Sequence, residues 1–532
     1  MMDQPANYLG YHSTGYFSKI VTDYLSQAAT LQPFYAHTPD LKGIEQSIAE
    51  RRRFDTPRKL LVQVLEQQYS GLDISSRLKE NIAALAADNS FTITTAHQPN
   101  IFGGPLYFIY KIIHTVKLAA ELQERLPGNR FIPVYYMGSE DADLDELGNI
   151  TVGGRKLVWE TKQTGAVGRM KVDKSLLKLI HEIHGQTGVL PFGDELNTIF
   201  QNCYTEGKTI QQATLELVNA LFGEYGLVVV IPDNPQLKTA FHSVVEKELL
   251  EGFSHTIVGE TITRLGENYK VQAGGREINL FYLTENKRER IELVNGQYEV
   301  RTLELSFSKE AILKELKEHP ERFSANVILR GAFQETILPN IVFIGGGGEL
   351  AYWLELKNVF AAVHIPYPVL ILRNSFLLMK KEQAAKLTQL GFSLSDLFRD
   401  EQTLLNQLVH RDSENQLNFD QERASMRALY EELKTIAKNV DGSLIDHVSS
   451  LEVRADKKLA ELQKKLLRAE RNKFETQQNQ IAKLKQELFP SGSLQERVDN
   501  FSTYYAREGK QWLENIYRSS TAFNDGFTIV VD

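Results

Sequence analysis

Cysteine is almost absent from this sequence: Cys203 is the one cysteine in 532 residues. A single thiol excludes an intramolecular disulfide and a zinc site built on several thiolates, and it fits a reducing compartment. The chain has no apolar run approaching the ~18–20 residues of a membrane helix, and its first residues lack the apolar region of a signal peptide. We therefore expect a cytoplasmic protein without a membrane partner.

Neither positive nor negative charge dominates the sequence. Lys and Arg total 60 against 68 Asp and Glu, which gives a formal net charge of −8. This balance argues against a general polyanion binder, so we expect no nucleic-acid partner. The apolar share of 42% and the charged share of 24% are ordinary for a globular protein. Because the chain is longer than the ~250–300 residues at which single cores stop growing, several domains are expected.

The composition and the hydrophobic pattern of the chain change near residue 380. Before it, short apolar runs alternate with helical patterns; the runs lie at 91–96, 131–137, 225–233, 326–333, 340–346 and 365–373. Runs that are apolar throughout are typical of strands covered on both faces, and their alternation with helices predicts an α/β fold with a doubly wound parallel sheet. We expect this core over residues 1–380, interrupted by insertions at about 151–224 and 234–325, the second carrying an Asn295-Gly296 hairpin turn.

The part after residue 380 is polar, helical and poor in glycine. Apolar residues recur at spacings of 3 and 4 over 443–488, and a second stripe over 426–440 precedes an Asp441-Gly442 break. One long helix needs a partner for its apolar seam, so an antiparallel helical hairpin is predicted. Its mixed-sign outer face is typical of a solvated coiled coil rather than a nucleic-acid arm. We expect a helical coiled-coil arm over 381–500 that makes a homodimer, followed by a C-terminal segment over 501–532.

The first candidate site follows the run at 91–96. A loop holds His97, Gln98 and Asn100, and Gly103-Gly104 precede a helix that begins at Pro105. The glycines let the backbone approach a ligand closely, and the helix start offers N–H groups to an anion. A Gly-Pro turn with a surface histidine is the alternative. Three polar residues in one loop at the carboxyl end of a strand favour function.

The second candidate site follows the run at 131–137. Gly138-Ser139 lead into five acids within seven residues: Glu140, Asp141, Asp143, Asp145 and Glu146. Acids at this position can ligate a metal, act as a general base or anchor a substrate ammonium. Helix capping would explain one or two of them. We predict an amine- or metal-facing role for Glu140 and Asp141.

The third candidate site is a glycine run between a strand and a helix. Gly345, Gly346, Gly347 and Gly348 precede Glu349. The run is neither the spaced dinucleotide fingerprint nor a P-loop, but consecutive glycine amides can form an anion-binding nest. A flexible turn is the alternative.

Four further residues are weaker candidates. Arg330 and Glu335 lie at the end of the predicted strand over 326–333, and Asp233 ends the run over 225–233, where a ribose hydroxyl is a usual partner. Arg373 ends the last predicted strand and could meet a phosphate or a carboxylate.

These segments together resemble one family, the cysteine-adding enzymes, or cysteine ligases, of bacillithiol biosynthesis. The resemblance is carried in order, from about residue 92 to 498, by TAHQPNIFGGPLY, PVYYMGSEDADLDE, GLVVVIPDNPQLK, LRGAFQETILPNIVFIGGGGELAYWLEL and LFPSGSLQERV. Among the positions at which the sequence departs from the family pattern, His97 stands for Gln, Asn100 for Gly, Ala142 for His, and Gly331 and Gly347 for Pro.

The resemblance implies a Rossmann-like core related to class I aminoacyl-tRNA synthetases, two connecting-peptide insertions and a dimer-forming coiled coil. It also implies that cysteine and glucosaminyl-malate are the substrates, joined through an amide. A free carboxylate needs activation, so ATP with Mg²⁺ is the expected cofactor. In this interpretation His97 and Asn100 act on the transferring phosphoryl group, Glu140 and Asp141 hold the amine, and the run at 345–348 holds a phosphate or the malyl carboxylates. Two alternatives remain: a non-catalytic nucleotide- or metabolite-sensing scaffold, and a nucleotidyltransferase acting on another small acid.

Overall fold

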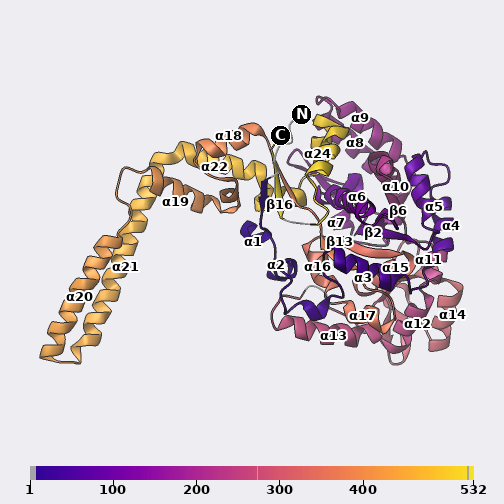
Figure 1. Cartoon of the computed structure of the whole chain (residues 1–532), viewed down its shortest axis with the longest axis horizontal. Coiled ribbons are helices and arrows are strands. Elements are labelled where there is room, and N and C mark those ends of the chain that lie inside the picture. Colours follow the sequence, from indigo (N-terminus) through magenta and orange to yellow (C-terminus); the bar gives the residue numbers. More distant parts are fainter. Residues whose placement is uncertain (1–6, 272–273, 524–525, 532) are drawn as a thin grey trace. The chain divides into compact units, whose positions relative to one another are not determined.

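The computed structural model describes residues 7–271, 274–523 and 526–531, and the chain divides into two compact units (Figure 1). Of the described residues, the first unit comprises those up to Leu377 together with those from Leu494 to Val530, and the second comprises Leu378–Ser493 and Val531. The second unit is therefore inserted into the sequence of the first. In the part of the chain that the structure describes, no helix combines the length and the apolar character needed to cross a membrane.

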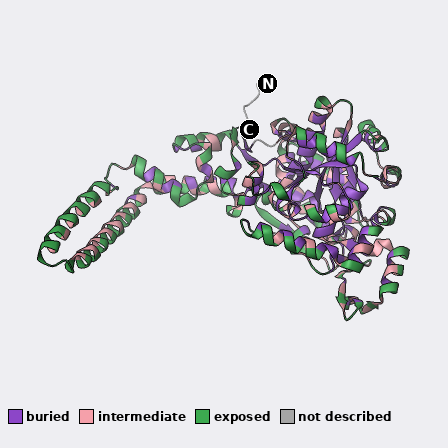
Figure 2. Ribbon diagram, turned by 60° about the horizontal axis from the view of Figure 1, so that its bottom comes forward, coloured by how far each residue is buried: buried purple, intermediate pink, exposed green. Residues whose placement is uncertain are grey.

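A five-stranded parallel sheet lies at the centre of the first unit, in the order β14-β13-β2-β3-β6. Its strands are β2 (Ser90–His97), β3 (Arg130–Met137), β6 (Val228–Val230), β13 (Asn340–Gly345) and β14 (Val369–Leu372). Nearly every strand residue is buried, which is why the strands read as continuous apolar runs (Figure 2). The predicted Rossmann-like parallel sheet is confirmed.

Helices cover this sheet. The segment before β2 contributes β1 (Asn7–Leu9), α1 (Tyr11–Thr14), α2 (Lys19–Leu25), α3 (Leu41–Arg51), α4 (Arg58–Gln68) and α5 (Ser76–Ala84). The crossover from β2 to β3 is α6 (Tyr107–Arg125), and β13 is joined to β14 through α16 (Gly347–Trp353) and α17 (Lys357–Ala362). Residues of α3, α6 and the strands form one buried apolar cluster.

Both predicted insertions are present as extra elements between core strands. Between β3 and β6 lie α7 (Leu144–Leu147), β4 (Asn149–Val152), β5 (Arg155–Val158), α8 (Lys174–Thr187), α9 (Gly193–Cys203) and α10 (Ile210–Phe222). Between β6 and β13 lie α11 (Pro235–Thr239), α12 (His242–Glu251), α13 (Phe253–Gly266), β7 (Leu280–Leu283), β8 (Arg288–Arg290), β9 (Glu292–Val294), β10 (Gln297–Val300), β11 (Leu305–Phe307), α14 (Lys309–Glu318), β12 (Phe323–Ala325) and α15 (Val327–Ile337). The predicted turn at Asn295-Gly296 joins β9 to β10, and both of its residues have positive φ.

The strand predicted over residues 326–333 is wrong. This segment is the helix α15, and the side chain of Asn326 caps it by accepting a hydrogen bond from the Ile328 N–H. A short run that is apolar all round fits a buried helix as well as a buried strand, and nothing in the periodicity separates the two.

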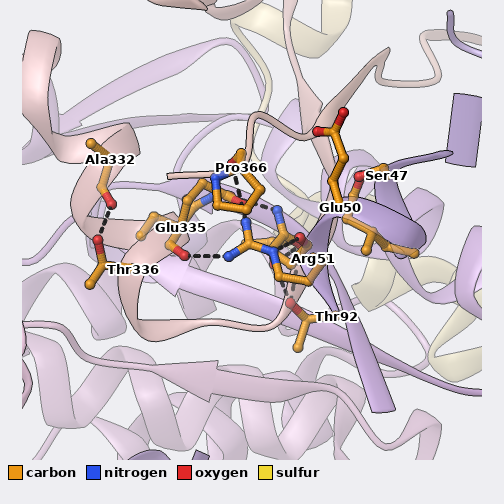
Figure 3. Close-up of polar contacts among 12 residues, drawn as sticks. Ser47, Glu50, Arg51, Thr92, Ala332, Glu335, Thr336 and Pro366 are labelled. Atoms are coloured by element: carbon orange, nitrogen blue, oxygen red, sulfur yellow. Dashed lines mark hydrogen bonds and ion pairs between the residues drawn. The ribbon is translucent and has the colours of Figure 1, made fainter. Parts of the chain in front are cut away.

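One end of α15 is fixed by a buried ion pair (Figure 3). Arg51 of α3 donates to the Glu335 carboxylate at 2.6 Å and to backbone oxygens of Glu335, Asn340 and Pro366. Burial raises the pKa of Glu335 and lowers that of Arg51 to about 10. Asn340 begins β13, so Glu335 lies toward the amino-terminal edge of the sheet and has a structural role, contrary to its prediction as a site residue.

The second unit is helical. It contains α18 (Lys381–Gln389), α19 (Glu401–Asp412), α20 (Asp420–Val440), α21 (Leu444–Arg471) and α22 (Glu475–Leu488), and β15 (Phe376–Met379) leads into it. Helices α20 and α21 lie side by side as the predicted antiparallel hairpin (Figure 1).

The single helix predicted over 443–488 is interrupted by a 3₁₀ turn at Asn472–Phe474. Helix α21 packs on both α20 and α19, whereas α22 packs on α19 and buries Ile481, Leu484 and Leu488.

After Leu494 the chain returns to the first unit. It forms α23 (Ser502–Glu508), α24 (Lys510–Ser519) and β16 (Phe527–Val531), and β16 pairs antiparallel with β1. The stretch from Leu494 to Asn500 has no long helix or strand, and its residues Glu496, Arg497 and Asn500 lie at the carboxyl-terminal edge of the parallel sheet.

Candidate active site

A cavity of about 690 Å³ opens at the carboxyl-terminal edge of the parallel sheet. Its walls come from the ends of β2, β3, β13 and β14, from α15, and from the second insertion. Of the predicted residues, those that line it are His97, Gln98, Glu140, Asp141, Arg330, Gly346, Gly347, Gly348, Glu349 and Arg373. This edge is where ligands bind in open α/β sheets.

Five predicted residues do not line the cavity: Asn100, Gly103, Gly104, Asp233 and Gly345. The two glycines of the first loop adopt backbone conformations that a tight turn requires. Gly103 and Gly104 have φ of 78° and 61°, and Asn500 Nδ2 donates to the carbonyl oxygens of Phe102 and Gly104 at 2.9 and 2.6 Å. Gly103 and Gly104 therefore form a turn that Asn500 fixes, outside the lining of the cavity.

His97 is the last residue of β2, and its side chain is 6% exposed. Its ring packs edge-on against Tyr107 and tilted against Phe108, at centroid distances of 5.2 and 5.5 Å. Among the described residues, its Nε2 has no hydrogen-bond partner. Burial lowers the pKa of His97 well below its usual value, and the neighbouring cations Lys111 and Arg330 lower it further. The imidazole is therefore neutral, with one nitrogen unpaired.

Lys111 is a site residue that the sequence analysis missed. It projects from α6, its Nζ donates to the Ala96 carbonyl at 2.9 Å, and it forms an ion pair with Glu349. A lysine inside the apolar run of this helix was the available signal, because fully buried lysines are rare unless they are paired.

The glycine run does not form the predicted nest. The Gly346 N–H donates to the Glu349 carboxylate at 2.9 Å, so a side chain already occupies the start of α16. None of Gly345–Gly348 has the positive φ that a nest alternates with right-handed residues. The glycines instead give the cavity a wall without side chains.

Arg373 also forms an ion pair within the protein. Its guanidinium donates to both carboxylate oxygens of Glu496 at 2.9 and 2.7 Å, and it lies 5.4 Å from the centroid of the Tyr107 ring. Glu496 is fully buried and, like Asn500, comes from the segment that returns to the first unit.

Glu140 belongs to a chain of buried charges. Its carboxylate pairs with Lys238 of α11 and accepts a hydrogen bond from Ser324 Oγ at 3.1 Å. Asp233 accepts from Arg169 at 2.6 Å on each oxygen and lies 3.5 Å from Lys238. The prediction that Asp233 meets a ribose is not supported, because Arg169 occupies both of its oxygens and holds its pKa low against the effect of burial.

The Asp141 carboxylate accepts hydrogen bonds from neutral groups. Its Oδ2 accepts from Gln98 Nε2 at 3.1 Å, and its Oδ1 accepts from the Asp143 N–H at 3.3 Å. Within the described ranges, no cation lies within 4 Å of its carboxylate, in contrast to Glu140 and Glu349. Of the acids predicted to meet an amine, Asp141 is the one still unpaired.

Cationic side chains outnumber acidic ones in the cavity. The cations are Lys111, Arg276, Arg288, Arg330, Arg373 and Arg497, and the acids are Glu140, Asp141, Glu146 and Glu349. This excess suits an anionic ligand, so the residues present fit a phosphate chain or a carboxylate group. The described residues contain no group of three or more His, Cys, Asp or Glu side chains that could hold a metal. Mg²⁺ that arrives with ATP phosphates needs one or two carboxylates at most.

Family models match both parts of the chain. The model for the N-terminal Rossmann-like domain of bacillithiol biosynthesis BshC matches residues 5–374, and that for its C-terminal coiled-coil domain matches residues 376–531. A protein from Flavobacterium johnsoniae named "Putative cysteine ligase BshC" is 40% identical over 528 residues, covering 99% of each chain. Relatives of the same name from Cytophaga hutchinsonii and Bacillus cytotoxicus are 36% and 26% identical, and cover 96% and 95% of this chain and 96% of their own.

A solved structure was also matched, that of a putative arginyl-tRNA synthetase from Campylobacter jejuni. It covers 84% of this chain and 98% of its own at 10% identity, with a TM-score of 0.23, which is too low to show a shared fold.

Proposed function

The chain belongs to the BshC family of bacillithiol biosynthesis, and we propose that it is a ligase that joins the carboxylate of cysteine to the amine of glucosaminyl-malate. The observation that carries this proposal is one cavity with an excess of cations and an unpaired carboxylate on Asp141. The cations suit the anionic groups of the substrates, and Asp141 suits an amine. The product is an amide, formed with loss of the cysteine carboxylate oxygen.

ATP with Mg²⁺ would supply the activation that a free carboxylate needs, by making the departing oxygen part of a phosphate leaving group. Lys111 is placed to bind its phosphates, because it lines the cavity beside the end of β2, where its Nζ donates to the Ala96 carbonyl. His97 can donate one hydrogen bond to the oxygen on which charge develops, and as a neutral ring it adds no further positive charge.

Asp141 is proposed to bind the substrate ammonium and to accept its proton before the nitrogen attacks. A carboxylate within reach of the amine can do both. Gln98 orients this carboxylate through the 3.1 Å hydrogen bond. Glu140 is assigned a supporting role, because Lys238 already neutralises it.

We further propose that the protein acts as a homodimer in the cytoplasm. The apolar residues along the hairpin of α20 and α21 include Leu429, Leu433, Ile436, Val440 and Leu462, which are between 38% and 77% exposed. Covering such a stripe with a second copy is the usual outcome for coiled-coil helices. A thiol product and a single cysteine fit a reducing compartment.

The proposal is tested by incubating the purified protein with cysteine and glucosaminyl-malate, with and without ATP and Mg²⁺, and measuring the amide-linked thiol by mass spectrometry. Product that needs both substrates and ATP, with pyrophosphate or phosphate released in equal amount, supports it. Serine in place of cysteine is the matched substrate control. The absence of product under every nucleotide would contradict the assigned reaction.

A further inference from the structure

Two arginines of the cavity are fixed in place but lack an acidic partner. Lys111 is paired with Glu349 and Arg373 with Glu496. Arg288 and Arg330, in contrast, have no carboxylate within 4 Å among the residues that the structure describes, and both are half-buried. Placing two cations together away from bulk water is unfavourable unless an anion joins them. Their arrangement therefore indicates a bound anion.

Arg288 is held rigidly by the second insertion. Its guanidinium lies 3.9 Å from the centroid of the Phe281 ring, its Nε donates to Ser324 Oγ at 3.0 Å, and its Nη2 donates to the Ala325 carbonyl at 3.2 Å. These contacts come from β7 and β12, the two strands nearest to β8 in this small sheet. They fix the plane of the guanidinium while it lines the cavity.

Arg330 comes from a different element, α15. Its Nη2 donates to the Tyr352 hydroxyl at 2.5 Å, so its position is fixed by a neutral group. The two arginines interact: burial lowers the pKa of Arg288, Glu140 and Asp141 raise it, and Arg330 lowers it again. Planar guanidinium groups in fixed orientations bind carboxylates through paired hydrogen bonds.

Ser324 connects this arginine pair to the acidic side of the cavity. Its hydroxyl accepts from Arg288 Nε and donates to the Glu140 carboxylate. Glu140 is followed in the chain by Asp141, the residue assigned to the amine. Asp141 also interacts electrostatically with Arg288, since it raises the pKa of that arginine, so the carboxylate-binding and amine-binding groups belong to one cluster of charges.

We propose that Arg288 and Arg330 bind the malyl carboxylates of the amine substrate and so select a dicarboxylate attached beside the amine. This inference rests on the proposed function. In glucosaminyl-malate the amine and the malyl group are attached to adjacent carbons of the sugar ring, which suits Asp141 and Arg288, two residues that line one cavity and interact electrostatically. The second insertion thus supplies substrate specificity, whereas the strand ends supply the reaction chemistry.

The test measures binding without turnover. Glucosaminyl-malate and methyl glucosaminide, which lacks the carboxylates, are titrated into wild type, Arg288→Met, Arg288→Lys and Arg290→Met by calorimetry. Arg290 lies on the same strand, is exposed and does not line the cavity, so it controls for the loss of one positive charge. Arg288→Met should weaken binding of glucosaminyl-malate by about 30-fold or more, as for the loss of one partner of a buried charge pair. Binding of methyl glucosaminide should not change.

Arg288→Lys keeps the positive charge but lacks the planar guanidinium, so it should lose an intermediate amount of affinity for glucosaminyl-malate. It also provides the test if Arg288→Met folds poorly. Equal binding of glucosaminyl-malate by wild type and Arg288→Met would overturn the inference while leaving the proposed reaction intact. Wild type that binds L-malate but not glucosaminyl-malate would support a dicarboxylate site and contradict the proposed substrate. Wild type that binds neither would overturn both.

Discussion

His97 combines a catalytic assignment with a buried position. A loop histidine is usually removed at little cost, but this ring is 6% exposed and packs against Tyr107 and Phe108. We expect His97→Ala to lower the stability by about 1–3 kcal/mol and the rate by about 10²–10³, the size typical of losing one donor to developing charge. His97→Gln, which keeps a donor and most of the volume, should retain more of both. Thermal unfolding and product formation separate the two effects, and a normal rate in His97→Ala would contradict the assignment.

His114 illustrates how a buried neutral imidazole makes stability depend on pH. Its ring accepts from the Asn374 N–H and lies 3.0 Å from the Ala522 carbonyl, and burial lowers its pKa to about 4. Between about pH 6.5 and pH 4 the unfolded chain binds a proton at this histidine that the folded chain does not, so stability falls as the pH falls through this window.

We therefore expect the free energy of unfolding to decrease below pH 6.5, by up to about 1.4 kcal/mol per pH unit from His114 alone. His114→Gln should be less stable at pH 7 but should lose less on acidification. Urea unfolding at several pH values between 7 and 5 measures the two slopes. Parallel slopes would show that this histidine does not contribute.

Lys238 is the cation on which two buried carboxylates depend. It contacts Glu140, Asp233 and the Glu321 carbonyl, and its side chain is 4% exposed. Lys238→Met leaves Glu140 buried without a cation, so we expect a loss of about 3–5 kcal/mol. The double variant Lys238→Met with Glu140→Gln removes that charge as well and should recover part of the loss. Chemical denaturation measures the stability of both variants. If the double variant is no more stable than Lys238→Met, Lys238 and Glu140 are not coupled.

At the scale of elements, two glycines that were both predicted to bind a ligand differ in whether the backbone needs glycine at their position. Gly104 has φ of 61°, and a Cβ there would lie 2.7 Å from the Asn100 Cβ. Gly348 has no such φ, and a Cβ there would meet nothing within 4 Å. We expect Gly104→Ala to destabilise the loop by about 1–3 kcal/mol and Gly348→Ala to be neutral or slightly stabilising, because alanine favours a helix. Thermal midpoints of the two variants test this contrast, which equal midpoints would refute.

The sequence was sufficient to predict the elements whose signal is local. The buried strands, the hairpin of α20 and α21, and the turn at Asn295-Gly296 all follow from patterns within a few residues. The error over residues 326–333 arose because an apolar run of that length has no distinctive period. The break at Asn472–Phe474 lies between α21, which packs on both α20 and α19, and α22, which packs on α19, and such packing depends on the tertiary fold.

The location of the candidate site could be predicted from the sequence, but the pairing of its charged side chains could not. The ends of β2 and β3 were located, so His97 and Asp141 were found in one cavity, which Arg330 reaches from the helix α15 instead of the predicted strand. What could not be read from the sequence was which charges are already paired. Arg373 meets Glu496 across 123 positions of the chain, and such a pairing depends on the tertiary fold alone.

At the scale of the whole molecule, the exposed apolar stripe of the hairpin predicts self-association. We expect light scattering to give the mass of a dimer for the wild type, and that of a monomer for Leu433→Glu combined with Ile436→Glu, residues that are 38% and 59% exposed. Lys438→Glu on the same helix changes the charge without touching the stripe and should remain dimeric. A monomeric wild type, or a dimeric stripe variant, would contradict the proposed homodimer.

The interrupted sequence of the first unit sets the order in which a newly made chain can become functional. A ribosome completes β14 and Arg373 long before it reaches Glu496 and Asn500, because the whole of Leu378–Ser493 is made in between. At roughly 5–20 residues per second this delay is on the order of 10 s. During it, Arg373 lacks its carboxylate and the turn at Gly103-Gly104 lacks the amide that fixes it. The nascent protein therefore carries an unfinished cavity until the arm has been translated, so a chain stopped within the arm cannot complete the site.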